Sequence, residues 1–357
     1  MNNVYIVKTS PKTVLTDYRN LLKKAITSKK FKLFGPIILK LNLSWTKFYP
    51  ACSTPPWQLE GVIKFLLENG ANPRNIIPVE NRTVVTDVRQ GAKNHAWTRI
   101  LRRYGIKMHY LPEEQYMKYQ PRAKMLILNK IFPKGIYLPK IIFDKPLISL
   151  CTMKTHVFTT TTGAIKNYFG MLNVNRHFAH RFIHETLVDL LQIQKEIHPQ
   201  MLGVMDGTIV GGGPGPRAME WYEKNYLLAS QDIVALDSVG AKMMGFNPLK
   251  IRYLKLSQER GLGIADFRKI KVKGAEISRV NFGFKPKDTF ASRGQKLIYR
   301  HFPLWLEKIL LQTAIAPWSY LASRVYFDIF WYNFVGKRRI NRFFSSAWGK
   351  VFLDYFY

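Results

Sequence analysis

The first two thirds of the chain alternate between short apolar runs and segments with helical spacing. The run at residues 36–43, PIILKLNL, is typical of a short buried strand. Two prolines then precede residues 57–71, which carry apolar residues at helical spacing and contain Gly70, a favourable helix terminator. The apolar run at 75–79 predicts a second strand. These elements together predict a strand–helix–strand unit.

The same alternation continues to about residue 273. Residues 91–104 have the pattern of one amphipathic helix, which Gly105 closes, whereas residues 111–145 are irregular and rich in proline and lysine. We expect further strands at 106–110, 146–151, 201–207, 226–230 and 269–273, and further helices at 180–197, 232–244 and 249–260. The alternation predicts an α/β fold with a mostly parallel sheet and helices on both of its faces.

The composition changes near residue 285. We therefore divide the chain into an α/β domain over 1–284 and a basic, aromatic-rich helical tail over 285–357. The longest uncharged run in the tail, from Ile309 to Ser323, has about 15 residues and is too short to span a bilayer. Aromatic residues interspersed with lysine and arginine over 299–357 are typical of a helix that lies on an anionic membrane. Packing on the domain and a homodimer interface are the alternatives.

The formal net charge of +32 indicates an anionic partner, such as a nucleic acid, a lipid surface or a small phosphorylated or carboxylated ligand. The 55 lysines and arginines are spread along the whole chain, and it carries no nucleic-acid-binding motif. This distribution disfavours a nucleic-acid partner and favours a small anion or a membrane surface. A general lysine-rich bias of the proteome is the simplest alternative.

Cysteine usage limits the cofactor chemistry. Cys52 and Cys151 are the two cysteines of the chain, and they cannot form a disulfide framework or a CxxC motif. We therefore expect no iron–sulfur cluster from the protein's own cysteines. The first fifteen residues lack the charged and apolar regions of a secretory signal. We expect a cytoplasmic protein, peripheral to the inner face of the membrane if the tail binds lipid.

The stretch 151–170, CTMKTHVFTTTTGAIKNYFG, concentrates cations, hydroxyls and glycine directly after a predicted buried strand. Lys154 and His156 share a face of any extended segment because they are two residues apart. Ligands of open α/β sheets collect at such strand ends, so we expect an anion site there. A surface turn with solvated cations is the alternative. Further predicted binding residues in this stretch are Thr162, Lys166 and Asn167.

Histidines follow this stretch closely. His177, His180 and His184 would fall on one face of a helix, and with His156 they could bind a divalent metal. The HExxH pattern of metalloproteases is absent, however, so these three are weak candidates as metal ligands. We expect His156 and His180 to act in proton transfer or ligand binding. The alternative is that one histidine has a functional role and the others are residues of the helix surface.

Acidic and amide side chains lie near other predicted element ends. Asp206 ends a predicted strand before the loop GGGPGP, so it is a candidate base or an anchor for Lys166; a simple Asp-Gly turn is the alternative. Asp232 is a natural helix N-cap, whereas Asp237 would face the site from within that helix. Asn42, at the end of the first predicted strand, is a further candidate binding residue.

These motifs resemble the DUF362 family of uncharacterised α/β proteins. The resemblance rests on SLCTMKTHVFTTTTGAIKNYFGML, GVMDGTIVGGGPGP and LLASQDIVALDSVGAKMMGF, with support from LKLNLSW and TPPWQLEGVIKFLLENGA, and it spans roughly residues 35–275. Many members carry a ferredoxin-type cysteine module, which associates the family with iron–sulfur chemistry. This chain departs from that pattern, because the aromatic tail stands in place of the module.

Two functional hypotheses follow. The first is an enzyme of unestablished reaction that binds a small carboxylate- or phosphate-bearing substrate in a cleft formed by lysine, histidine and aspartate side chains. The second is a non-enzymatic protein of the membrane surface that uses its basic charge and aromatic tail.

Overall fold

A mixed, nine-stranded sheet forms the centre of the computed structural model, which describes residues 3–26, 31–83, 86–303, 321 and 324–357. The strand order is β11 (Lys271–Gly274), β1 (Asn3–Lys8), β10 (Glu220–Ser230), β9 (Met201–Gly212), β7 (Leu147–His156), β2 (Ile37–Lys40), β3 (Ile76–Glu80) and β4 (His109–Tyr110), with β8 (Thr160–Thr161) paired to β7. Of these, β10 runs antiparallel to both neighbours and β8 antiparallel to β7; every other pairing is parallel. The predicted, mostly parallel sheet is therefore confirmed.

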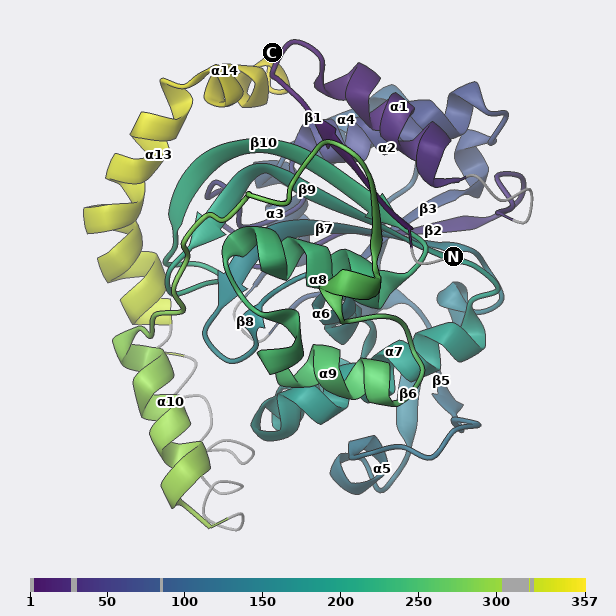
Figure 1. Ribbon diagram of the computed structural model, residues 1–357, viewed down its shortest axis with the longest axis vertical. Coiled ribbons are helices and arrows are strands. Elements are labelled where there is room, and N and C mark those ends of the chain that lie inside the picture. Colours follow the sequence, from purple (N-terminus) through teal and green to yellow (C-terminus); the bar gives the residue numbers. More distant parts are fainter. Residues whose placement is uncertain (1–2, 27–30, 84–85, 304–320, 322–323) are drawn as a thin grey trace.

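Helices cover both faces of this sheet, also as predicted (Figure 1). One face carries α1 (Val14–Ala25), α2 (Pro56–Glu68), α3 (Val88–Asn94) and α4 (Trp97–Arg103). The opposite face carries α6 (Ala164–Asn167), α7 (Ile183–Ile197), α8 (Ile233–Met244) and α9 (Arg252–Glu259). The irregular segment 111–145 adds α5 (Leu128–Ile131) and a separate hairpin-like pair, β5 (Tyr116–Tyr119) and β6 (Ile136–Pro139).

Strands β7 and β9 are longer than their apolar cores predicted. All ten residues of β7 are buried, because helices cover both faces of a parallel strand in the middle of the sheet. Lys154 and His156 therefore lie inside the strand, whereas the sequence predicted that they lie in the loop that follows it. Asp206 likewise lies within β9, which continues to Gly212, so both the predicted strand end and the Asp-Gly turn are wrong.

The bounds of several predicted helices differ from those observed. The single helix at 91–104 is divided into α3 and α4 by Ala96, whose φ of 60° is left-handed. The break coincides with a long-range contact, because the indole of Trp97 donates to the carbonyl of Thr54 at 2.9 Å. The helix predicted from residue 180 begins only at Ile183, after a 3-10 segment (Val174–Phe182), and the one predicted at 249–260 is α9.

The C-terminal part is helical, as predicted, with α10 (Phe290–His301), a π-type helix η8 (Val325–Gly336), α13 (Lys337–Phe344) and α14 (Ala347–Asp354). The last three pack on the sheet face that carries α1 and α2, where Trp348 lies 4.8 Å from Trp57 between ring centroids. Most of the uncharged run between Ile309 and Ser323 lies outside the described residues. Within the described part of the chain, no helix is long and apolar enough to cross a membrane.

Candidate functional site

The order of the strands creates a switch point between β2 and β7. From β2 the chain proceeds outward to β3 and β4, whereas β7 and β9 lie on the other side of β2. Crevices at the carboxyl ends of strands flanking such a point are the usual ligand sites of open α/β sheets. Lys40 ends β2 and His156 ends β7, with Lys154 two residues earlier. The predicted cations therefore stand at this position.

A buried ion pair joins Lys40, at the end of β2, to Glu80, at the end of β3, next to the switch point. Nζ of Lys40 lies 2.8 Å from Oε1 of Glu80 at the end of β3, and both side chains are almost fully buried. Burial lowers the pKa of Lys40, while the Glu80 charge opposes that shift. Glu80 also accepts backbone N–H groups from Leu43 and Asn81, both within 2.8 Å. These contacts saturate the pair, which makes it a fixed part of the framework.

Lys154 is held in place by three hydrogen bonds of its ammonium group. Its ammonium donates to Oδ1 of Asn42 at 2.7 Å, to the carbonyl of Cys52 at 2.9 Å and to the hydroxyl of Thr152. The side chain is 1% exposed, and burial lowers its pKa to about 8. Because all three donor positions are engaged, Lys154 contributes positive potential rather than a free contact. Asn42 lies beside Lys154, as its position after the first strand suggested.

Lys166 has a different environment. It projects from α6 with its Nζ 4.4 Å from the centroid of the Phe169 ring, and it makes no hydrogen bond to any described residue. Burial, together with the charges of Arg176, Lys154 and Lys40, lowers its pKa to about 7. Its side chain is partly exposed. Among the predicted cations, Lys166 is therefore the one whose ammonium is available to a ligand.

The hydrogen bonds of His156 and His180 fix opposite tautomers. Nδ1 of His156 accepts the backbone N–H groups of Phe158 and Thr159 at 3.1 and 3.3 Å, so a neutral ring carries its proton on Nε2. Nδ1 of His180 lies 2.9 Å from the carbonyl of His177 and must donate to it, which leaves Nε2 unprotonated. Burial lowers the pKa of His180 to about 3 and that of His156 well below 6.5.

These groups make up a cluster with an excess of basic side chains, which we call the switch-point cluster. Arg176 belongs to it, since it is 5% exposed and burial lowers its pKa to about 10. Electrostatic interactions connect Lys166 with Arg176, Lys154, Lys40, His156 and His180. The members are Lys40, Glu80, Lys154, His156, Lys166, Arg176 and His180. An anion would offset the mutual repulsion of these cations.

Three other predicted binding residues form the frame of the cluster. The carboxylate of Asp237 accepts the backbone N–H groups of Ala164 and Ile165, at 2.7 and 3.0 Å, and so caps α6. The N-terminus of α6 is thereby occupied, although the sequence offered it as part of an anion cradle. The hydroxyl of Thr162 donates to backbone carbonyls of β7, and the Asn167 amide donates to the Lys40 carbonyl and to Ser149.

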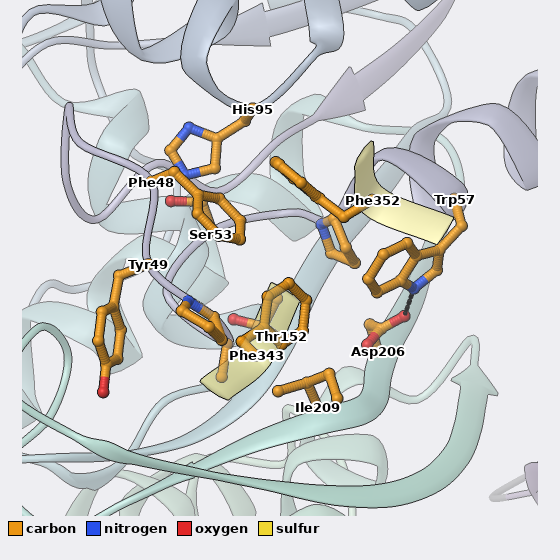
Figure 2. Close-up of a pocket in the computed structure, with 13 residues that line it drawn as sticks. Phe48, Tyr49, Ser53, Trp57, His95, Thr152, Asp206, Ile209, Phe343 and Phe352 are labelled. Atoms are coloured by element: carbon orange, nitrogen blue, oxygen red, sulfur yellow. Dashed lines mark hydrogen bonds between the residues drawn. The ribbon is translucent and has the colours of Figure 1, made fainter. Parts of the chain in front are cut away.

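Asp206 is not in contact with these cations. Its carboxylate accepts hydrogen bonds from Tyr18 at 2.6 Å and Trp57 at 3.0 Å, on the face that carries α1 and α2. It lines a small cavity of about 20 Å³ together with Thr152 and His95; Figure 2 shows these lining side chains. Phe343 of α13 and Phe352 of α14 also line this cavity. The structure therefore places Asp206 and Lys166 in different surroundings.

The histidines proposed as metal ligands are not arranged as a metal site within the described residues. His184 stacks on Tyr253 with ring centroids 6.1 Å apart, and the His177 ring contacts Phe178. Within the described ranges, no group of three or more histidine, cysteine, aspartate or glutamate side chains could hold a metal ion. Asp232, in contrast, caps α8 as predicted by accepting the N–H of Ala235.

Sequence reasoning missed Lys40, Glu80 and Arg176. A detectable signal existed for the first two, because each is a charged residue inside or directly after an apolar strand pattern. Such a residue must be paired when the strand is buried on both faces. Arg176 lies among the histidines and has no comparable signal, because its burial depends on the packing of the 3-10 segment.

Comparison with known proteins identifies the family of the chain. The family model described as "Domain of unknown function (DUF362)" matches residues 37–242, which is more than half of the chain. The match includes every member of the switch-point cluster and ends before α10. No curated protein matches the chain. The resemblance to DUF362 motifs is confirmed, and the chain belongs to the DUF362 family.

Proposed function

We propose that the protein is an enzyme that binds a small carboxylate- or phosphate-bearing molecule at the switch-point cluster. The excess of buried basic groups over the single carboxylate of Glu80 carries this proposal. Burying uncompensated cations is costly, and a bound anion would remove that cost. The location supports the same reading, because the cluster lies at the carboxyl ends of β2 and β7.

The cations would have unequal roles. Lys166 would contact the anionic group directly, because its ammonium makes no hydrogen bond to the described residues. Lys154 and Lys40 would make the electrostatic potential at the site more positive without contacting the anion, since the N–H donors of their ammonium groups are already engaged. A site of this kind binds through charge and a small number of hydrogen bonds, which suits a compact anion rather than a polymer.

The two imidazoles would supply acid–base chemistry beside the bound anion. Once the bound anion raises the lowered pKa of His180, its Nε2 would accept a proton from the ligand, and the N–H at Nε2 of His156 would donate a hydrogen bond to a developing negative charge. Both rings are neutral at physiological pH because their pKa values are lowered. A role for Asp206 as base remains a prediction.

The first experiment is mass and elemental analysis of molecules that copurify with the native protein, followed by calorimetric titration with sulfate, acetate and any anion so identified. We expect Lys166→Ala to weaken anion binding at least about tenfold, because it removes the charged group that contacts the anion. Lys130→Ala, at an exposed lysine, is the matched control and should bind like the wild type. Unchanged affinity in Lys166→Ala would place the anion site elsewhere.

A further inference from the structure

Helix η8 presents a continuous apolar stripe to solvent. Val325, Ile329, Phe330 and Phe334 are 46%, 60%, 55% and 72% exposed. Successive members lie four residues apart, except that Ile329 and Phe330 adjoin, and a helix with i→i+5 hydrogen bonds brings such positions onto one side. These four residues are called the stripe. Contiguous apolar surface of this kind usually marks an interaction site.

The stripe cannot turn inward, because the other side of η8 is anchored. Phe327 and Trp331 are each 7% exposed and pack against Trp45, with ring centroids 6.5 and 6.0 Å away. The indole N–H of Trp45 donates to Asp328 at 2.6 Å. The helix is therefore fixed by its buried side, and burying the stripe requires a second surface outside the described fold.

Positive charge surrounds the stripe. Exposed cations stand at its two ends, Arg324 before it and Lys337 and Arg338 after it. Asp328, which lies between the ends, is directed toward Trp45 and is largely covered. Helix α10 extends the same edge of the molecule in Figure 1 and adds Phe290, which is 85% exposed, without any acidic residue of its own.

We infer that the stripe docks onto an anionic membrane surface, with η8 lying in the plane of the interface. Aromatic and aliphatic side chains enter the headgroup boundary while flanking lysine and arginine side chains reach anionic lipids. Charge complementarity selects this partner over a second copy of the chain, because two molecules of net charge +32 repel each other. This docking is independent of the anion site proposed above.

The test is flotation of the full-length protein with vesicles of phosphatidylcholine alone and of phosphatidylcholine with phosphatidylserine. We expect binding to the anionic vesicles that weakens with salt, and a partition coefficient at least about tenfold lower for the triple variant Ile329→Ser, Phe330→Ser, Phe334→Ser. The matched control is Phe34→Ser, Met117→Ser, Tyr137→Ser, which removes exposed apolar side chains far from the stripe and should bind like the wild type.

Two results would overturn the inference. One is equal flotation of the wild type and the triple variant on anionic vesicles, with thermal unfolding showing that both are folded. The other is a wild-type dimer in size-exclusion chromatography with light scattering that the triple variant converts to a monomer, since the stripe would then bind a second copy. Sulfate binding at the switch-point cluster, measured on the same variants, should be unchanged whichever result is obtained.

Discussion

The carboxylate of Asp237 occupies the space that a β-carbon on Gly163 would need. This relationship explains why glycine follows the threonine run, although the φ of 173° at Gly163 is open to any residue. Asp237 reaches the first two N–H groups of α6 only because residue 163 has no side chain. The cap in turn sets the direction of α6 and the position of Lys166.

Gly163→Ala should therefore destabilise the protein by roughly 1–3 kcal/mol, because the β-carbon forces a buried, hydrogen-bonded carboxylate to move. Urea unfolding followed by circular dichroism measures the change. The control is Gly294→Ala in α10, where a β-carbon meets nothing within 4 Å and helix propensity favours alanine by about 0.5–1 kcal/mol. Equal stabilities for the two variants would contradict the steric account of Gly163.

The Lys40–Glu80 pair gives a second prediction. Lys40→Met leaves the Glu80 carboxylate buried without its cation, which should cost roughly 3–5 kcal/mol of unfolding free energy. Adding Glu80→Gln removes the unpaired charge and should restore a large part of that loss. A double-mutant cycle in urea measures the coupling, and additive effects of the two substitutions would show that the pair is not a unit.

The tautomers of His156 and His180 can be observed directly. Nitrogen-15 chemical shifts of the imidazole rings should show a proton on Nε2 of His156 and on Nδ1 of His180. Both rings should stay neutral from pH 8 down to pH 5, because burial lowers both pKa values and that of His180 to about 3. Titration of either ring near pH 6.5 would contradict the buried environment described for it.

Local patterns predicted the sheet well because its strands are apolar on both faces. The apolar runs that contain Ile37 and Ile76 identified β2 and β3, and strand–helix alternation identified the parallel pairing. The same criterion placed the end of β7 too early, at residue 151 instead of His156. Its polar residues stay in the strand because partners distant in sequence satisfy them, as Asn42 and the Cys52 carbonyl do for Lys154.

Part of the candidate site was predicted because several of its residues are neighbours in the sequence. Lys154, His156, Lys166 and His180 stand close together in sequence, and the turn at β8 with the short helix α6 keeps them close in space. The role of Asp237 depends on its contact with α6, 73 residues away in sequence, which no local spacing reveals. Membrane docking by the tail and the division at residue 285 remain predictions.

The charge state of Lys166 predicts how anion binding depends on pH. In the empty site its pKa is lowered to about 7, so the ammonium loses its proton between pH 6 and pH 9. Because the anion binds the protonated form, binding must take up a proton above pH 7, and affinity should fall as the pH rises. Lys166→Arg keeps its charge over this range and should show a flatter dependence.

Calorimetric titration of the wild type and Lys166→Ala with sulfate, whose own charge is constant from pH 6 to pH 9, tests the central claim most directly. The account predicts binding to the wild type that weakens as the pH rises, and at least about tenfold weaker binding to Lys166→Ala at pH 6. Equal affinity of the two proteins for sulfate, or affinity that increases with pH, would contradict an anion site built on the switch-point cluster.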